Sequence, residues 1–301
     1  MVDMINPQLG ETVLDPACGT GGFLTSTLEH LKKQAKTVED RKIIQDSVLG
    51  IEKKPLPHLL AVTNLILHDV EVPKIHRDNS LARPLRDYGS KDRVSAVLSN
   101  PPFGGVEEDG IQANFPLSYR TKETADLFMI LILERLKENG RAAVVLPDGF
   151  LFGEGVKTRI KEKLLEECNL HTIVRLPNGV FAPYTSISTN LLFFEKGEQT
   201  EEVWFFEHPY PDGQKSYSKT KPIRIEEFDL EKQWWDNREE NEYAWKISSE
   251  EIKSKGYNLD IKNPNKVEES TKLTVPEILS KIQDKNQKIY QLTEELNRIL
   301  G

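Results

Sequence analysis

Three short stretches of the sequence hold the residues whose types and spacing suit chemistry. In DPACGTGGF (15–23) an acid precedes a cluster of glycines, and in NPPF (100–103) an amide and an aromatic ring flank two prolines. The third set consists of two acids, Glu52 and Asp78, that each follow a short apolar run. Because the carboxyl ends of parallel strands share one edge of a sheet, these stretches predict a single ligand site.

The glycine-rich stretch lies between a predicted strand and a predicted helix. Gly19, Gly21 and Gly22 carry no Cβ, so a ligand can approach the backbone closely. No Gly-Lys-Ser/Thr sequence follows, which argues against a phosphate-binding P-loop. Asp15 instead favours a cationic or amine-bearing ligand. Taken alone, the stretch is equally consistent with a glycine-rich turn that binds nothing.

The acids that follow the next two predicted strands strengthen the case for a ligand. Glu52 lies 37 residues after Asp15, where nucleoside-binding α/β folds place an acid on the ribose hydroxyls. Asp78 and Asn79 follow the third predicted strand and could bind the exocyclic amine of an adenine. Each acid alone is typical of a solvated surface, but three at successive strand ends form a pattern. A nucleoside cofactor without a phosphate indicates S-adenosylmethionine.

The NPPF stretch is suited to a planar amine, which is a poor nucleophile because its lone pair is delocalised. The Asn100 side-chain carbonyl accepts hydrogen bonds and stays unprotonated at neutral pH. The Pro101 carbonyl is a second acceptor on a backbone fixed by Pro101 and Pro102, and Phe103 can stack on a flipped base. Methyl transfer then needs mainly alignment and no general base. Alone, the stretch is more simply a turn that ends a strand.

Alternating apolar strands and amphipathic helices predict the parallel α/β sheet that would position these residues. Predicted strands cover 11–15, 47–52, 74–78, 94–99, 141–147, 170–177 and 189–197. Predicted helices cover 23–36, 55–70 and 124–140, the last ending on Gly140 as a C-cap. We therefore expect a mostly parallel seven-stranded sheet in a catalytic domain spanning residues 1–200.

The sequence after residue 200 differs in composition. Residues 201–270 are rich in aromatic and turn residues and are predicted to form an appendage and a linker (256–271), with Trp234, Trp235 and Trp245 as packing anchors. Apolar residues at 278, 282, 289, 292, 296 and 299 form a heptad seam in a predicted helix, 276–300. That helix, within a segment 271–301, is either folded back on its own domain or a coiled-coil arm for a partner.

Composition restricts the class of protein. The 301 residues are 38% hydrophobic and 29% charged, as in globular proteins. The net charge of −8 argues against the chain binding DNA by itself. The longest apolar run, 127–133, is too short to cross a membrane, and no signal peptide is visible. Two cysteines and scattered histidines predict no disulfide framework and no metal site. A cytoplasmic location is expected.

The sequence resembles the modification subunits of type I restriction–modification systems, which are N6-adenine DNA methyltransferases. The matching stretches are GETVLDPACGTGGFL, LSNPPFGG, TADLFMILILERLKENGRAAVVLPDGFLF, IVRLPNGVFAPYTSISTNLLFFEKG and NEYAWKIS. The resemblance implies a Rossmann-like S-adenosylmethionine-dependent methyltransferase fold. It implies a cofactor site made of Asp15, Pro16, Ala17, Cys18, Gly19, Thr20, Gly21, Gly22, Phe23, Glu52, Asp78 and Asn79. It implies a target-base site made of Asn100, Pro101, Pro102 and Phe103.

The resemblance also implies partners: double-stranded DNA, a specificity subunit that reads the DNA sequence, a second modification subunit and a restriction subunit. Members of the family carry a helical domain and a Phe/Tyr-Thr-Pro segment before the first strand, whereas here 14 residues precede Asp15. The sequence therefore corresponds to the carboxyl-terminal two-thirds of such a subunit.

Two other functions remain open on the sequence. A glutamine-N5 or rRNA methyltransferase uses a related Asn-Pro-Pro motif, although commonly with Tyr where Phe103 stands. A catalytically silent assembly module would also account for a shortened chain. Two loops carry separate predictions. The loop 104–123 is a solvated surface loop or becomes ordered only when DNA binds, and the loop 177–189, which follows a strand at the same edge, could reach a flipped base.

Overall fold

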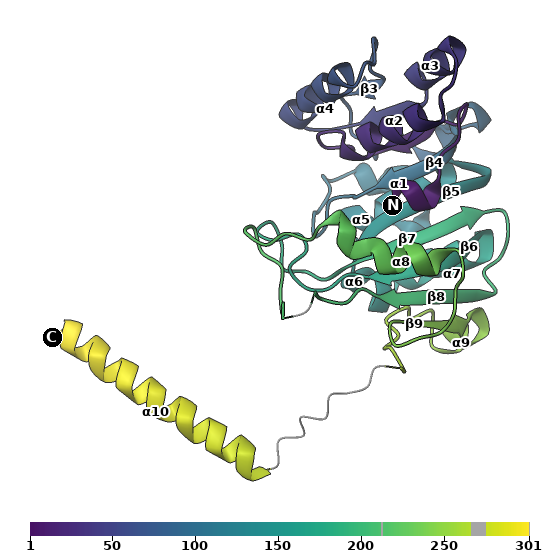
Figure 1. Cartoon of the computed structure of the whole chain (residues 1–301). Helices are drawn as coiled ribbons and strands as arrows, with labels where there is room; N and C mark the ends of the chain where they lie inside the picture. Colours follow the sequence, from purple (N-terminus) through teal and green to yellow (C-terminus); the bar gives the residue numbers. More distant parts are fainter. Residues whose placement is uncertain (212, 266–274, 301) are drawn as a thin grey trace. The chain divides into compact units, whose positions relative to one another are not determined.

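The computed structural model describes residues 1–211, 213–265 and 275–300, and the chain forms two compact units, 1–264 and 265–301. Nine strands among the described residues form one mixed sheet in the order β3-β2-β1-β4-β5-β7-β6-β8-β9 (Figure 1). The strands are β1 (Val13–Asp15), β2 (Val48–Ile51), β3 (Ile75–His76), β4 (Val94–Ser99), β5 (Leu136–Pro147), β6 (Cys168–Arg175), β7 (Thr189–Lys196), β8 (Glu202–Glu207) and β9 (Ala244–Ser248).

Helices connect most of these strands, as parallel pairing requires. They are α1 (Val2–Ile5), α2 (Gly22–Gln34), α3 (Val38–Gln45), α4 (Pro55–Leu67), α5 (Thr124–Arg135), α6 (Asp148–Phe152), α7 (Val156–Glu167), α8 (Asp229–Trp235), α9 (Ser249–Ser254) and α10 (Val275–Leu300). None of the described helices is both long and apolar enough to cross a lipid bilayer.

Both faces of the sheet are buried. Successive residues of a strand point to opposite faces, and accordingly Val13 and Ala96 pack in one apolar cluster with Trp234 of α8. Their neighbours Leu14 and Val97 pack in a second cluster that contains the apolar side chains of α5 and α7. Helices on both faces explain why the central strands read as nearly continuous apolar runs.

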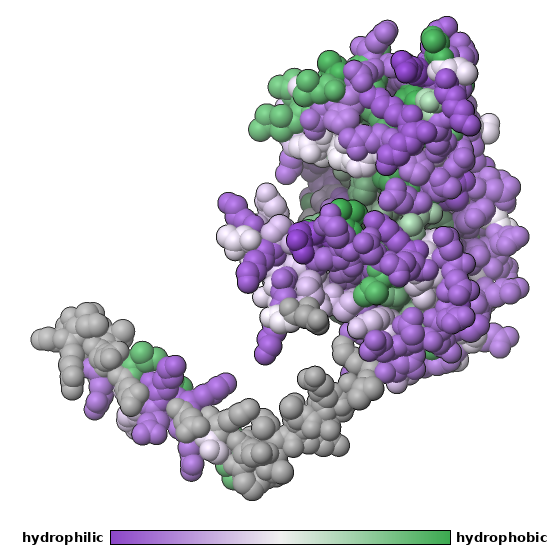
Figure 2. Space-filling model, viewed as in Figure 1, coloured by the Kyte–Doolittle hydropathy of each residue, from purple (hydrophilic) through white to green (hydrophobic). Residues whose placement is uncertain are grey.

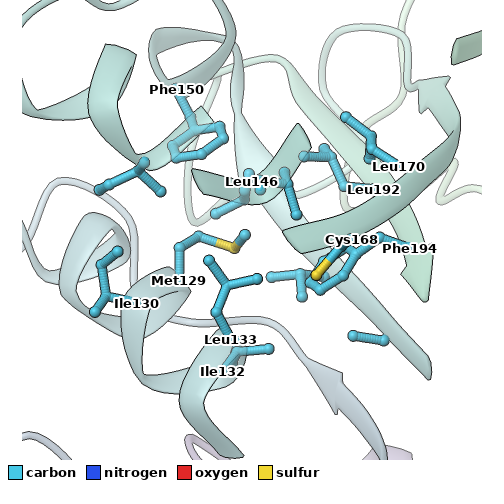
Figure 3. Packing of buried hydrophobic residues seen from close by; sticks show 14 of the residues in the cluster. Met129, Ile130, Ile132, Leu133, Leu146, Phe150, Cys168, Leu170, Leu192 and Phe194 are labelled. Atoms are coloured by element: carbon cyan, nitrogen blue, oxygen red, sulfur yellow. The ribbon is translucent and has the colours of Figure 1, made fainter. Parts of the chain in front are cut away.

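Helix α5 is the most deeply buried helix near the predicted site. Met129 and Leu133 pack with Leu146 of β5 and Phe194 of β7 (Figure 3). Every residue of α5 except Glu134 is buried, which fits a sequence that is apolar around most of its circumference. The helix is therefore fixed by the core, and its amino end is held at the edge of the sheet where β4 ends.

The seven predicted strands are all present, and their core pairs are mostly parallel. The predicted end of the helix beginning at Thr124 is wrong: α5 ends at Arg135, and Gly140 lies inside β5 rather than at a helix C-cap. Leu136 already pairs with Val94 of β4, and the register shifts before Arg141. Sheet pairing and burial of Leu136 thus outweigh the helical pattern.

The segment after residue 200 continues the sheet. β8 pairs in parallel with β6, and β9 pairs antiparallel with β8. The sequence predicted an appendage there, with a boundary at 200; the compact unit instead extends to Pro264. The interpretation of the tryptophans as packing anchors is confirmed for Trp234 and Trp245, which are 6% and 0% exposed. Trp245 stacks on Phe205 of β8 at 5.3 Å and 10°.

The predicted carboxyl-terminal helix is present as α10, and residues 266–271 of the predicted linker lie outside the described residues. On the seam of α10, Ile282, Ile289 and Leu292 are exposed. In the first unit, apolar side chains also gather on the outside of α4 (Figure 2), where Leu59 and Leu67 are 59% and 74% exposed.

Candidate functional site

The fold brings the predicted site residues to one edge of the sheet. β1, β2, β3 and β4 are parallel neighbours, so their carboxyl ends lie side by side. Asp15 ends β1, Glu52 follows β2, Asp78 follows β3 and Asn100 follows β4. The local sequence explains why β1 and β4 stop there, because Pro16 and Pro101 directly follow the acid and the amide.

The glycine-rich turn between β1 and α2 has the conformation that glycines favour. Gly19 and Gly21 have φ angles of +54° and +86°, in the left-handed region that residues with a Cβ rarely adopt. The turn is fixed to the neighbouring strand by the Cys18 N–H, which donates to the Ile51 carbonyl at 3.0 Å. A Cβ placed on Gly19 or Gly22 would meet no atom within 4 Å, so the outer side of the turn is open.

Asp15 is the most perturbed acid at this edge. Its side chain is buried, and Oδ1 accepts hydrogen bonds from the Ala17 N–H and from the Ser99 hydroxyl, both at 3.0 Å. Burial raises the pKa of Asp15 to about 7; the two hydrogen bonds offset part of the rise, and the nearby charge of Glu52 adds to it. A cationic group placed beside Asp15 would favour the ionised carboxylate.

Glu52 supports the glycine-rich turn directly. Its Oε2 accepts a hydrogen bond from the Gly19 N–H at 3.0 Å, and its Oε1 accepts one from the Lys54 N–H at 2.7 Å. Each carboxylate oxygen has a further lone pair, so the same side chain can accept hydrogen bonds from a ligand. The acid therefore has a structural role that its position in the sequence did not predict.

Asp78 and Asn79 differ in how free their side chains are. Asp78 is exposed, and one of its oxygens accepts a hydrogen bond from the Asn79 N–H at 2.7 Å. The Asn79 side chain accepts from the Leu81 N–H at 3.0 Å and donates to Glu107 at 3.2 Å. Asp78 thus keeps an accessible carboxylate oxygen, whereas Asn79 is largely occupied by its own chain.

The other predicted cofactor residues mainly form the walls of the turn. Pro16 and Cys18 are buried, Ala17 is half-buried and Thr20 is exposed. Burial raises the pKa of the Cys18 thiol to about 12, so it remains protonated and unreactive. Phe23 packs against the apolar cluster that contains Val13, and therefore contributes to the core of the fold.

The NPPF turn places its functional groups toward solvent. Pro101 is buried while Asn100 and Pro102 are exposed, and within the described chain the Asn100 amide makes no hydrogen bond. Phe103 meets Phe181 edge-on, with ring centroids 6.0 Å apart and an interplanar angle of 79°. Phe181 belongs to the loop 177–189, so that loop lies beside the turn; that it reaches a flipped base stays a prediction.

A cavity of about 580 Å³ adjoins Phe103. Its walls come from the amino end of α5, the end of β5, α6, the start of α7 and Ile187. Asp148 lies in this wall and accepts a hydrogen bond at 2.7 Å from the buried Asn190. A hollow of about 870 Å³ lined by the start of β6, the start of β8 and α9 contains none of the predicted site residues, whereas Phe103 lines the smaller cavity.

Ser99 and Glu107 are site residues that the sequence did not reveal. Ser99 connects the end of β4 to Asp15, and Glu107 connects the loop after the NPPF turn to Asn79. A polar residue at the last position of a buried strand was the available signal for Ser99; the contact of Glu107 with Asn79 spans 28 residues and left no signal. In the loop 104–123, Phe115 is anchored in the core at 2% exposure, whereas the other residues of the loop are exposed or half-buried.

Comparisons with known proteins agree with this arrangement. The sequence profile of the N-6 DNA methylase family matches residues 1–272. The methylase subunit of the type I restriction enzyme EcoEI from Escherichia coli is 56% identical, over all of this chain and 63% of its own length. A modification subunit of a type I restriction enzyme from Vibrio vulnificus has 54% identity and a TM-score of 0.85, over 88% of this chain and 58% of the other.

The fold class is supported by a more distant structure. A class I S-adenosylmethionine-dependent methyltransferase from Listeria monocytogenes, 18% identical, has a TM-score of 0.55 over 78% of this chain and 67% of its own. The chain therefore has the Rossmann-like fold of these methyltransferases, and it spans about three-fifths of the length of the Escherichia coli and Vibrio vulnificus subunits. The match to the family profile over most of the sequence shows that the chain belongs to the N-6 DNA methylase family.

Proposed function

We propose that this chain binds S-adenosylmethionine and transfers its methyl group to N6 of adenine in double-stranded DNA, as the modification subunit of a type I restriction–modification complex in the cytoplasm. The observation that carries the proposal is the hydrogen bond between Ser99 and Asp15. It places the start of the NPPF turn beside the glycine-rich turn, so an amine bound at Asn100 and a cofactor bound at Asp15 would be neighbours.

The residues present fit S-adenosylmethionine. Glycines leave the outer side of the first turn open, and the buried carboxyl of Asp15 is suited to a positively charged ligand. Glu52 and Asp78 supply carboxylate oxygens for hydroxyl and amine groups at the ends of the next two strands. No P-loop lysine follows the glycines, in keeping with a cofactor that has no phosphate. When bound, the cofactor supplies an electrophilic methyl group.

The NPPF turn acts on the amine. Asn100 Oδ1 and the Pro101 carbonyl accept hydrogen bonds from the two N–H groups of adenine N6, which draws the nitrogen lone pair out of the ring system. With the cofactor bound, transfer of its methyl group would leave positive charge on N6. Both acceptors would stabilise that charge until the proton passes to solvent water. Phe103 and Phe181 provide the apolar surface against which the base is held.

The proposed partners rest on the family, and the charge of the chain and α10 agree with them. A net charge of −8 argues against the chain alone supplying the phosphate contacts that bring a protein onto DNA. We propose that a specificity subunit supplies the DNA contacts and the sequence reading, that α10 joins the chain to it, and that a second modification subunit and a restriction subunit complete the complex.

The decisive experiment is methyl transfer to DNA by the chain assembled with its specificity subunit. Asn100→Ala is expected to lower the rate by about 10²-fold or more, because one preorganised acceptor at the reacting nitrogen is lost. Asn237→Ala, which alters an exposed asparagine next to α8, is the matched control and should leave the rate unchanged. Full activity of Asn100→Ala, or methylation of glutamine or rRNA in place of DNA, would overturn the proposal.

A further inference from the structure

Behind the NPPF turn lies a lysine that bridges two carboxylates. Lys157, in the first turn of α7, donates to Asp126 at 2.7 Å and also to Glu123. Glu123 immediately precedes α5, and Asp126 lies in its first turn. The side chains of Lys157 and Asp126 are 12% and 2% exposed, so this ion pair is well shielded from solvent. Lys157 therefore connects α7 to the amino end of α5.

Gly153 also restricts the position of the Lys157 side chain. A Cβ placed on Gly153 would lie 2.1 Å from Cδ of Lys157, so the Gly153 backbone lies directly against the aliphatic part of the lysine. Burial by itself would lower the pKa of Lys157, but the bonds to Asp126 and Glu123 prevail and the pKa is raised. The ammonium therefore stays charged in a fixed place, on the wall of the cavity beside Phe103.

The amino end of α5 in turn holds the loop that continues the NPPF turn. The Thr124 N–H donates to the Gly105 carbonyl, and the Glu107 N–H donates to the Lys122 carbonyl, both at 3.1 Å. Val106 and Glu123 form an antiparallel bridge between these hydrogen bonds. A Cβ on Gly105 would lie 2.9 Å from the Thr124 hydroxyl, so the two segments are in close contact.

We infer that Lys157 is a positioning residue for methyl transfer: by holding Glu123 and Asp126 it fixes the start of α5, and through α5 it fixes the backbone that carries Phe103. The inference rests on the proposed function, because the turn it positions is the proposed target-base site. Among the described residues, the hydrogen bonds and ion pairs of Lys157 go to Glu123 and Asp126 and not to the NPPF residues. Lys157 therefore acts on the turn through Gly105 and Thr124.

Lys163 provides a matched control. It also lies on α7, is 14% exposed, and bridges two carboxylates, Glu134 at 3.3 Å and Glu167 at 2.5 Å. Glu134 is near the carboxyl end of α5, far along the helix from Thr124. Lys157→Met and Lys163→Met therefore each remove a shielded lysine that joins α7 to α5, at opposite ends of α5; the carboxylates paired with Lys163 are the more exposed, at 33% and 42%.

The first measurement is hydrogen exchange of the Glu107 and Thr124 amides in the full chain. Lys157→Met is expected to speed their exchange by about tenfold or more, since the local opening becomes easier, while Lys163→Met leaves both rates unchanged. Lys157→Arg should restore protection. If Lys157→Met does not fold, Glu123→Gln replaces it, because that side chain is 62% exposed. Equal rates in the Lys157 and Lys163 variants would overturn the inference.

The second measurement is methyl transfer by the same variants in complex with the specificity subunit. Lys157→Met is expected to lower kcat by about 10²-fold with an unchanged Kd for S-adenosylmethionine, as a misplaced binding surface does, and Lys157→Arg to recover most of it. Looser exchange without a fall in kcat would overturn the positioning role. If the unsubstituted complex transfers no methyl group to DNA, the proposed function fails, while the exchange rates still decide whether Lys157 holds the loop.

Discussion

At the scale of single residues, Asp15 couples ligand binding to protonation. Two hydrogen bonds offset only part of the effect of burial, so the pKa of its carboxyl reaches about 7. In the unfolded chain the same group has a pKa of about 4. The folded chain without a ligand therefore holds a proton on Asp15 through much of the range in which the unfolded chain has released it, and a cation bound nearby would release that proton.

This difference predicts a pH dependence of stability. Because the folded pKa is raised, the stabilising contribution of Asp15 is fully present below about pH 4 and is lost as pH rises through about 7, by roughly 4 kcal/mol in total. Denaturant unfolding of the chain and of Asp15→Asn across this range checks it. The stability of the native chain relative to Asp15→Asn should fall with rising pH; a constant difference would contradict the pKa.

The contacts of single residues also show which parts of the site could not be predicted from the sequence. Asp15, Glu52 and Asn100 were predictable because the carboxyl end of a strand is visible in the sequence as the last residue of an apolar run. The contacts that join distant parts of the site were not predictable. Ser99 bonds to Asp15 across 84 residues, and Lys157 pairs with Asp126 across 31. Such contacts depend on which strands and helices become neighbours, which a single sequence does not state.

At the scale of elements, apolar runs located the seven predicted strands because most of their residues are buried, and β1, β4 and most of β7 are buried on both faces. The pattern failed at Leu136, where pairing with Val94 ends a helix that the sequence would have extended to Gly140. It also failed for β8 and β9, which are short and aromatic and stand within a turn-rich part of the sequence. Their place in the sheet depends on side-chain packing, above all that of Trp245 on Phe205.

That packing predicts how the unit 1–264 unfolds. Trp245→Ala is expected to destabilise the whole unit by about 3–5 kcal/mol, in a single transition, because a fully buried ring is removed from the sheet's core. Trp245→Phe should cost less than about 1.5 kcal/mol, since the indole N–H has no hydrogen-bond partner in the described structure. Thermal unfolding followed by circular dichroism measures both. Two separate transitions would show that residues 201–264 fold independently.

At the scale of the whole molecule, α10 is the part expected to depend on a partner. Ile282→Asp with Ile289→Asp is predicted to abolish assembly with the specificity subunit without altering the Tm of the unit 1–264, because both exposed side chains lie on the heptad seam. Gln283→Asp with Gln287→Asp adds the same charge off the seam and should assemble normally. Size-exclusion chromatography separates the outcomes. Assembly of the seam variant would contradict the proposed arm.

The two buried cysteines can report local opening of the fold. Cys18 packs in the apolar cluster that contains side chains of α2 and α4, and Cys168 packs in the cluster that contains side chains of α5 and α7. Burial raises the pKa of each thiol to about 12. A thiol-specific reagent therefore reacts only with molecules that have opened. Since Cys18 is part of the glycine-rich turn and Cys168 begins β6, their separate labelling rates distinguish local opening at the proposed cofactor site from unfolding of the sheet.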